Sequence, residues 1–201
     1  MESYKEVNRF VYNKHAKEFK KFTKDYLKEY LLEDVRAFLE SFNGNKILDL
    51  GSGPGRDASF FAEEGFNPVC LDISIEMIDL CRKNNLIGVV GDLENLCFNE
   101  DSFDAVWAYT SLLHSPKEKL DYNLSQIRRI LKDKGVLYLG MKEGNFEGFL
   151  ESYKYPGAKR FVSLYTDEEL SETASQQFEI IHKSKVRLEK AVFLNYLCRK
   201  K

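Results

Sequence analysis

The sequence predicts an α/β protein with a doubly wound, seven-stranded sheet that is mostly parallel, with an antiparallel last strand and helices on both faces. From residue 46 onward, short apolar runs alternate with helical stretches, as in strand–helix–strand units around a parallel sheet. The last two apolar runs, 178–188 and 191–199, are separated by only two residues. A parallel return needs a dozen or more residues, so these two strands must pair antiparallel.

The individual elements follow from the apolar pattern, taken from the N-terminus. Residues 3–42 carry apolar side chains at three- and four-residue spacing, which predicts helices, and Asn43-Gly44-Asn45 predicts a turn. The predicted strands are residues 47–50, 68–71, 87–90, 103–108, 135–141, 178–188 and 191–199. The predicted helices that follow the first strand are residues 56–64, 74–84, 116–131 and 166–176. The last of these helices starts with Thr166 and Glu169 at the spacing of a capping box.

The bulk composition is that of a soluble globular domain. The chain has 201 residues, of which 43% are apolar and 31% are charged. No apolar stretch approaches the ~20 residues that a membrane span needs, and the first residues lack the apolar core of a secretory signal. The four cysteines have spacings that suit neither zinc nor a disulfide framework. We therefore expect a cytoplasmic location, no membrane association and no metal.

The charge distribution leaves one alternative partner open. The net charge is −2, which gives no overall reason to expect nucleic acid. Residues 182–201, however, carry seven Lys or Arg against Glu189 alone. Such a strip could touch phosphate, although a solvated strand face and tail is the reading we favour. Nucleic acid is therefore not the expected partner.

A glycine-rich turn follows the first predicted strand. It reads Gly51-Ser52-Gly53-Pro54-Gly55 and leads into a helix. Asp72 lies 21 residues after Gly51, at the end of the second strand, where a carboxylate can accept hydrogen bonds from both hydroxyls of a ribose. Because ligands of open α/β sheets bind at the carboxyl ends of the strands, the two features predict a site for a nucleoside-bearing cofactor.

Two cofactor classes compete for this turn. A nicotinamide enzyme would show G-x-G-x-x-G, with the helix N-terminus free for pyrophosphate. Here Arg56 stands where the third glycine belongs, and Gly55 is one place early. Asp49 adds a carboxylate at the end of the first strand, which suits a ligand with a cationic amino group better than a pyrophosphate.

The segment Asp49-x-Gly51-x-Gly53-x-Gly55 resembles the glycine motif of class I S-adenosylmethionine-dependent methyltransferases, which have a Rossmann-like fold. Gly91-Asp92-Leu93 is similar to the segment that follows the third strand in that family, and 103–108 to its fourth strand. The reversed last strand agrees with the family's topology. The resemblance covers about residues 45–141.

The resemblance implies a cofactor site for S-adenosylmethionine. The glycine motif would hold the methionine part, Asp72 the ribose hydroxyls and Asp92 the adenine amino group. Ile73 and Met77 match positions that pack against the adenine ring, although Met77 alone would suit core packing. The residues expected at the cofactor are Tyr12, Asp49, Gly51, Ser52, Gly53, Gly55, Arg56, Asp57, Asp72, Ile73, Met77, Gly91, Asp92, Leu93, Ala108 and Tyr109.

His114 is the candidate general base. It follows the fourth strand by six residues, on the cofactor side of the sheet. Its unperturbed pKa of about 6.5 suits proton transfer near neutrality. Packing against, or capping of, the helix that follows is an equally weighted alternative. Tyr12 lies in a segment that resembles the Y-D-x-x-A-x-x-Y sequence of many small-molecule methyltransferases, from which Asn13 and Phe19 depart. The resemblance implies that Tyr12 closes over the cofactor.

The acceptor is expected between the N-terminal helices and residues 142–164. We expect this segment to be a long substrate loop, lined by its aromatic residues, with Arg160 available for an acidic group. Tyr109, His114 and Arg160 are the candidate acceptor contacts. The aromatic residues in question are Phe146, Phe149, Tyr153, Tyr155 and Phe161.

The expected organisation is one methyltransferase domain over residues 1–201. It comprises an N-terminal helical cap (1–42), a cofactor-binding core (46–141), the substrate loop (142–164) and a helix with a C-terminal hairpin (165–201). Methyltransferases that act on amino groups of nucleic acids carry an Asn/Asp-Pro-Pro-aromatic motif after the fourth strand. This sequence has Ala108-Tyr109-Thr110-Ser111 at that position. We therefore expect methyl transfer to an O or N atom of a small molecule. The alternatives are an RNA or protein methyltransferase, a non-catalytic cofactor-binding module and a nicotinamide dehydrogenase.

Overall fold

The computed structural model describes residues 3–152 and 155–201. Its helices are α1 (Tyr4–Lys14), α2 (Ala16–Thr23), α3 (Tyr26–Tyr30), α4 (Leu32–Glu40), α5 (Arg56–Glu63), α6 (Ile75–Lys83), α7 (Leu120–Ile130) and α8 (Asp167–Gln177), with the 3-10 helices η1 (Leu112–His114) and η2 (Lys117–Lys119). Its strands are β1 (Lys46–Leu50), β2 (Asn67–Asp72), β3 (Ile87–Val90), β4 (Phe103–Tyr109), β5 (Leu131–Lys142), β6 (Phe146–Glu151), β7 (Lys159–Leu164), β8 (Phe178–Leu188) and β9 (Ala191–Lys200). None of the helices in these ranges has both the length and the apolar character that crossing a membrane requires.

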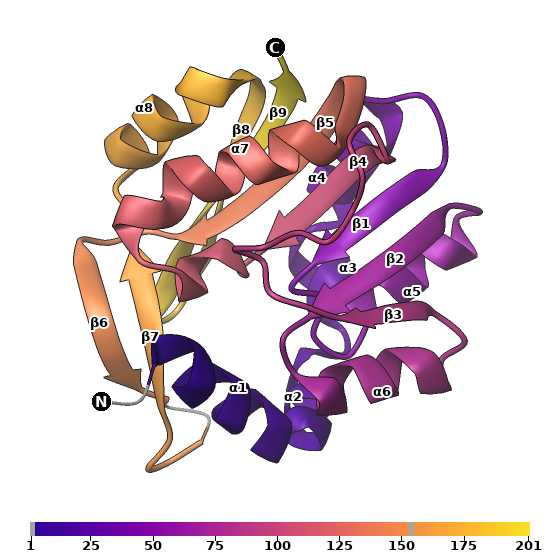
Figure 1. Ribbon diagram of the computed structural model, residues 1–201. Coiled ribbons are helices and arrows are strands. Elements are labelled where there is room, and N and C mark those ends of the chain that lie inside the picture. The colour runs from indigo at the N-terminus through magenta and orange to yellow at the C-terminus, as the bar shows by residue number, and fades with distance from the viewer. Residues whose placement is uncertain (1–2, 153–154) are drawn as a thin grey trace.

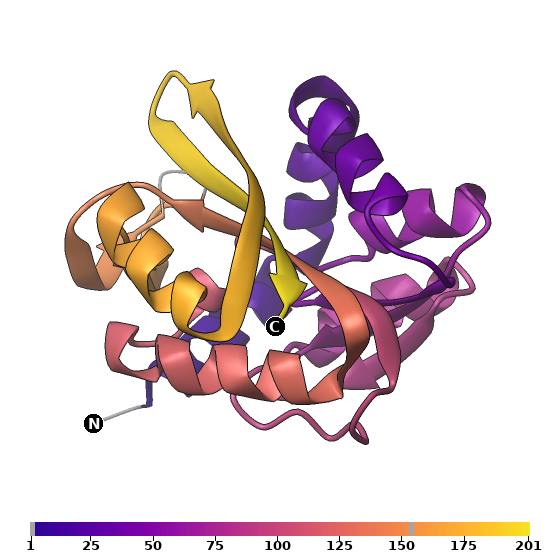
Figure 2. The ribbon, with the colours of Figure 1, turned by 90° about the horizontal axis from the view of Figure 1, so that it is seen from above.

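The main sheet has the predicted topology. In the described part of the chain, seven strands lie in the order β3-β2-β1-β4-β5-β9-β8, and Figure 1 shows them as one twisted sheet between layers of helices. The pairs from β3 to β5 are parallel. β9 runs antiparallel to both β5 and β8. The last strand in the sequence therefore lies between β5 and β8 in the sheet. In Figure 2 this hairpin extends as a long twisted ribbon.

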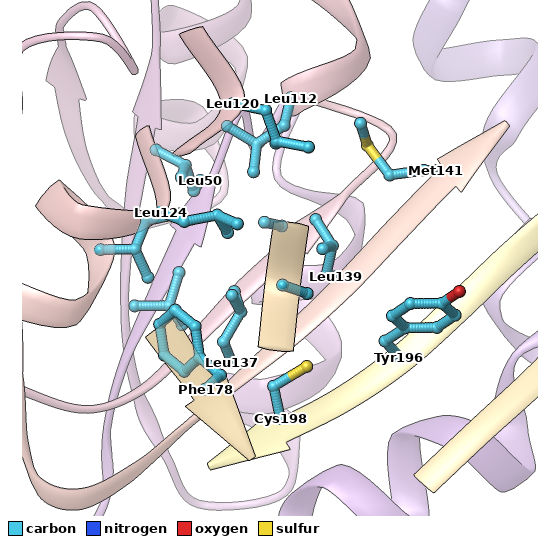
Figure 3. Close-up of a cluster of buried hydrophobic side chains, with 14 of the residues drawn as sticks. Leu50, Leu112, Leu120, Leu124, Leu137, Leu139, Met141, Phe178, Tyr196 and Cys198 are labelled. Carbon is cyan, nitrogen blue, oxygen red and sulfur yellow. The ribbon is translucent and has the colours of Figure 1, made fainter. Parts of the chain in front are cut away.

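The sheet separates two apolar cores, because successive side chains of a strand point to opposite faces. On β4, Val106 and Ala108 pack toward α7 and α8, and Figure 3 shows part of that core. Trp107 points the other way, toward α3, α4 and α5. Its ring stacks on Tyr138 at 3.9 Å between centroids and contacts Phe38 edge-on. The two cores hold the carboxyl ends of the parallel strands in fixed register.

The N-terminal cap lies across those carboxyl ends. Residues 3–42 are helical as predicted, but they are divided into four short helices. α1 starts with a capping box in which Ser3 and Glu6 exchange hydrogen bonds with each other's backbone N–H groups. It packs between β7 and α6, as Figure 1 shows. Helix α8 likewise starts with the predicted capping box of Thr166 and Glu169.

The prediction of a long loop over 142–164 is wrong. β6 and β7 form an antiparallel pair in which Phe149 lies opposite Phe161. β6 is mostly exposed, so it lacks the apolar alternation that marks a strand in the sequence. Gly144, Gly148 and Gly157 also gave the segment the composition of a loop. Tyr153 lies outside the described residues.

Two other boundaries differ from the prediction. The helix expected over 116–131 is the short 3-10 helix η2 followed by α7, which begins at Leu120. β5 begins at Leu131, four residues before its predicted start at Gly135. Neither difference moves the strand ends that form the site.

Candidate active site

The loop between β1 and α5 requires glycine. Gly51, Gly53 and Gly55 have φ angles of 71°, 53° and 77°, which side chains with a Cβ rarely adopt. A Cβ on Gly51 would lie 2.3 Å from the Cβ of Ser111, which is far inside contact distance. The backbone N–H groups of Gly51 and Ser52 both donate to the carbonyl of Leu71, at 2.7 and 3.0 Å. The loop is therefore fixed to β2 and lies close against the segment that follows β4.

A cavity of about 700 Å³ lies along the carboxyl ends of the strands. Its size is within the ~300–1,000 Å³ of ligand sites. Fourteen of the predicted cofactor residues line it: Tyr12, Asp49, Gly51, Ser52, Gly53, Arg56, Asp57, Asp72, Ile73, Met77, Gly91, Asp92, Leu93 and Tyr109. His114 and Arg160 line it too. The cavity thus joins residues predicted for the cofactor to residues predicted for the acceptor.

Two predicted cofactor residues do not line this cavity. Ala108 is fully buried in the core toward α7. A Cβ on Gly55 would meet Leu86 at 2.7 Å and Cys81 at 3.0 Å, so this glycine packs on the α6 side of the loop. Position 55 requires glycine because its φ is positive and because Leu86 and Cys81 leave no space for a Cβ. Gly55 immediately precedes α5 and turns the chain into that helix.

Asp72 is held at the wall by the backbone. Its carboxylate accepts hydrogen bonds from the N–H groups of Gly53, at 2.9 Å, and Ser74, at 2.8 Å. Burial raises the pKa of Asp72 to about 6 in spite of these hydrogen bonds. A carboxylate oriented by two fixed donors at the end of β2 has its remaining lone pairs available to ligand hydroxyls.

Asp49, Arg56 and Asp57 form a buried charged group beneath the glycine loop. Arg56 donates to both carboxylate oxygens of Asp57 from Nε and Nη2, at 2.5 and 2.7 Å. Asp57 also accepts from Nε1 of Trp107, at 2.9 Å. Among the described residues, Asp49 accepts only from the N–H of Ala58, at 3.2 Å. Burial and the neighbouring Asp57 raise the pKa of Asp49, so a cationic ligand nearby would favour its ionised form.

Tyr12, His114 and Arg160 form a hydrogen-bonded chain. Arg160 donates from Nη1 to the Tyr12 hydroxyl at 2.8 Å, and that hydroxyl lies 2.7 Å from Nε2 of His114. Nδ1 of His114 lies 2.8 Å from the carbonyl of Phe161. Because a carbonyl only accepts, Nδ1 carries the proton and Nε2 is the acceptor atom. Burial, with the nearby Arg160 charge, lowers the pKa of His114 to about 4, so the ring is neutral near pH 7.

The segment between β4 and η1 is strained. Thr110 has a φ of 56°, which is rare for a β-branched residue and is found where the surroundings enforce it. Its N–H donates to the carbonyl of Gly140 at 2.8 Å. The adjacent Ser111 hydroxyl is buried at the wall and has no hydrogen-bond partner in the described part of the chain. A ligand atom could satisfy it.

Comparison with known proteins assigns the family. A family described as a methyltransferase domain matches residues 47–135, which contain the glycine loop, Asp72 and Asp92. Residues 47–135 are therefore a methyltransferase domain of the class I S-adenosylmethionine-dependent type that the sequence predicts. This confirms the predicted family and its cofactor, S-adenosylmethionine.

Curated relatives of this methyltransferase match over part of their length. The chain is 35% identical over 101 residues to sarcosine/dimethylglycine N-methyltransferase of Aphanothece halophytica, with 46% of this chain and 36% of that protein covered. It is 29% identical over 160 residues to malonyl-[acyl-carrier protein] O-methyltransferase of Erwinia pyrifoliae, with 76% and 57% covered. An uncharacterized protein of Methanocaldococcus jannaschii is 30% identical over 139 residues, with 66% and 59% covered. The chain therefore spans 36% to 59% of the length of these relatives.

Solved structures confirm the fold. Magnesium protoporphyrin IX methyltransferase of Synechocystis PCC 6803, solved with SAH, superposes with a TM-score of 0.76 at 16% identity, covering 99% of this chain and 100% of that one. The 1,6-didemethyltoxoflavin-N1-methyltransferase of Burkholderia thailandensis gives 0.75 at 21% identity, covering 97% and 88%.

The residues of the methyltransferase fit S-adenosylmethionine. Its ammonium group would place a cation near the buried Asp49, which makes no ion pair with a described residue. The ribose hydroxyls would donate to Asp72, which the Gly53 and Ser74 N–H groups hold at the end of β2. Gly51 and Gly53 line the cavity and have no side chains, so their backbone atoms can contact a ligand directly. Among the described residues there is no group of three or more His, Cys, Asp or Glu side chains that could hold a metal.

Glu94 is a site residue that the sequence did not reveal. This buried carboxylate accepts from Tyr4 and, at 2.7 Å, from Ser115, and it pairs with Lys5 at 2.6 Å and Lys119 at 2.8 Å. Burial alone would raise its pKa, but the hydrogen bonds from Lys119, Lys5 and Tyr4 lower the pKa of Glu94 to about 2. Lys5 also pairs with Asp92 at 2.6 Å. The network connects α1 to the end of the cavity where adenine is expected.

Proposed function

We propose that the chain transfers the methyl group of S-adenosylmethionine to an oxygen or nitrogen atom of a small-molecule acceptor. The observation that carries the proposal is the continuity of the cavity. It extends from the glycine loop and Asp72 to the Tyr12–His114–Arg160 chain and the β6–β7 hairpin. A protein that aligns a donor and an acceptor needs both in one enclosed space.

Each part of the cofactor has its own residues in this proposal. Asp72 accepts from the ribose hydroxyls and Asp92 from the adenine amino group, with Ile73 and Met77 against the ring. The glycine loop and Asp49 hold the methionine end. When bound, S-adenosylmethionine supplies an electrophilic sulfonium methyl group, so the chain's task is to position an acceptor in line with it.

His114 takes the acceptor's proton in this proposal. Its Nε2 is the unprotonated nitrogen, because the Phe161 carbonyl fixes the proton on Nδ1. The Tyr12 hydroxyl contacts Nε2 in the present structure. An acceptor hydroxyl or amine would displace the Tyr12 hydroxyl from Nε2, and that hydroxyl would keep its hydrogen bond from Arg160. A positioned base contributes typically ~10²–10⁴-fold to the rate.

The basic C-terminal strands do not favour RNA as the acceptor. Lys183 and Lys185 pair with Asp167, and Lys185 also pairs with Glu143. Lys200 pairs with Asp101. These ion pairs neutralise cations that a phosphate-binding strip would need. The expected cytoplasmic location remains a prediction.

The test is transfer of a labelled methyl group from S-adenosylmethionine to a fractionated cell extract. We expect label in the low-molecular-weight fraction and none with His114→Ala. Label in the RNA or protein fraction would show that the acceptor is a macromolecule and would overturn the proposal of a small-molecule acceptor. A chain that binds the cofactor but labels no fraction would be a non-catalytic module.

A further inference from the structure

Arg160 is a cation of the cavity wall without a charged partner. Its Nη1 donates to the neutral Tyr12 hydroxyl, and its guanidinium carbon lies 5.6 Å from the centre of the Tyr12 ring. Its Nε is buried and has no hydrogen-bond partner in residues 3–152 and 155–201. Burial raises the pKa of Tyr12, so this phenol stays neutral and cannot balance the charge. Within the described residues, no carboxylate lies within ion-pair distance of Arg160.

Arg56, which lines the same cavity, shows how a guanidinium group binds a carboxylate in this protein. Arg56 uses Nε and Nη2 to bind both oxygens of Asp57. Arg160 makes its hydrogen bond to Tyr12 from Nη1, and its Nη2 makes no hydrogen bond to a described residue. Because Nε is buried, Nη2 is the nitrogen that a carboxylate in the cavity would contact.

We propose that the methyl acceptor is a small molecule with a carboxylate, which Arg160 binds through its guanidinium group, with Nη2 as the donor nitrogen that makes no hydrogen bond to a described residue. This inference rests on the proposed function, because it describes the acceptor of the same cavity. The carboxylate anchors the acceptor beside His114, whose Nε2 is connected to Arg160 through the Tyr12 hydroxyl. Arg160 would then fix the orientation of the acceptor relative to the base and the cofactor.

A bound carboxylate would also prepare His114 for its role. The charge of Arg160 is the second cause, after burial, of the low pKa of His114. An anion on Arg160 offsets that charge and raises the pKa of His114 toward its ordinary value. The base would become stronger when an acidic acceptor is in place.

The methionine carboxylate of the cofactor is the other possible source of the anion. Binding of S-adenosylhomocysteine and of 5′-methylthioadenosine distinguishes the acceptor carboxylate from the cofactor carboxylate. 5′-Methylthioadenosine keeps the nucleoside of S-adenosylhomocysteine but has no carboxylate. If Arg160 served the cofactor, Arg160→Gln would weaken binding of S-adenosylhomocysteine and leave 5′-methylthioadenosine unchanged. That result would overturn the acceptor assignment. We expect the affinity for both to stay within about twofold.

To test the acceptor side, acetate and benzoate are titrated into the complex of the chain with S-adenosylhomocysteine. The neutral amides acetamide and benzamide are titrated in the same way as controls. We expect at least one carboxylate, and neither amide, to bind the wild-type chain. Arg160→Gln should weaken that binding by about tenfold or more, and Arg160→Lys should retain part of it, because lysine keeps the charge but not the fork. Arg36→Gln is the matched control, since Arg36 is exposed on α4 and does not line the cavity.

Unfolding midpoints of all variants show whether the loss is specific. Absence of carboxylate binding to the wild-type chain, or binding that Arg160→Gln leaves intact, would overturn the inference. If the wild-type chain does not bind S-adenosylhomocysteine, the proposed function fails. The carboxylate titration of the free chain then still tests the Arg160 site independently.

Discussion

The Tyr12 hydroxyl lies 2.7 Å from Nε2 of His114, so one hydrogen bond joins the N-terminal cap to the segment after β4. Arg160, from the β6–β7 hairpin, donates to the same hydroxyl. Three segments distant in the sequence thus converge on one point of the cavity wall. The cap and the hairpin therefore both contribute side chains to the wall of the site.

His114→Ala should lower turnover by about 10²–10⁴-fold, because the acceptor's proton loses its base. The affinity for S-adenosylhomocysteine should change little. Turnover and cofactor titration with the acceptor found in the extract screen check both. His182→Ala is the control, since His182 is exposed on β8. Equal turnover of the His114 variant and the wild-type chain would remove His114 from the mechanism.

The neutral form of His114 should make stability depend on pH. Its folded-state pKa of about 4 lies below the ordinary 6.5, so its stabilising contribution is present above pH 6.5 and is lost as pH falls toward 4. We compare the free energy of unfolding of the wild-type chain with that of His114→Gln. The difference, wild type minus variant, should decrease by at most about 3 kcal/mol as pH falls from 6.5 to 4. Urea titrations from pH 7 to pH 4 measure it. A difference that is flat with pH contradicts the assignment.

Asp72→Asn should weaken S-adenosylhomocysteine binding by about 100-fold, since an amide cannot accept from the Gly53 and Ser74 N–H groups and two ribose hydroxyls together. In the wild-type chain, affinity should fall as pH drops below about 6, because the raised pKa of Asp72 lets it protonate there. Calorimetric titrations at pH 5 and pH 8 check the sign. Tighter binding at pH 5 would exclude this role.

Gly51→Ala should destabilise the fold by about 2–4 kcal/mol and abolish cofactor binding, because its Cβ would collide with Ser111. Gly65→Ala is a matched control. Gly65 has a comparable φ of 88°, but a Cβ there would meet nothing within 4 Å, so only the backbone strain of about 1 kcal/mol applies. Urea unfolding compares the two. Equal losses would mean that the Ser111 contact is unimportant.

Glu94→Gln should destabilise the chain at pH 7 by about 1–3 kcal/mol, because Lys5 and Lys119 lose their shared anion. The lowered pKa of Glu94 means that this contribution is present above pH 4.5 and disappears as pH falls to about 2. Hydrogen exchange should become faster in α1. Glu118→Gln, on exposed η2, is the control. Unchanged protection of α1 would show that the network does not hold the cap.

The sequence predicts the sheet correctly, and fourteen of the residues predicted for the cofactor line one cavity, because both predictions rest on local sequence patterns. The glycine turn, Asp72 and Asp92 each follow a strand directly, so strand order alone brings them together. The acceptor side depends on contacts between distant segments. No sequence pattern near Glu94 predicts its contacts with Lys5 of α1 and Lys119 of η2. The exposed strand β6 lacks the alternation of apolar residues that would have distinguished it from a loop.

Calorimetric titration of the wild-type chain with S-adenosylhomocysteine and with NADH tests the central claim most directly. The site of Asp49, the glycine loop and Asp72 predicts one molecule of S-adenosylhomocysteine per chain and no heat with NADH. Binding of NADH without binding of S-adenosylhomocysteine would contradict it.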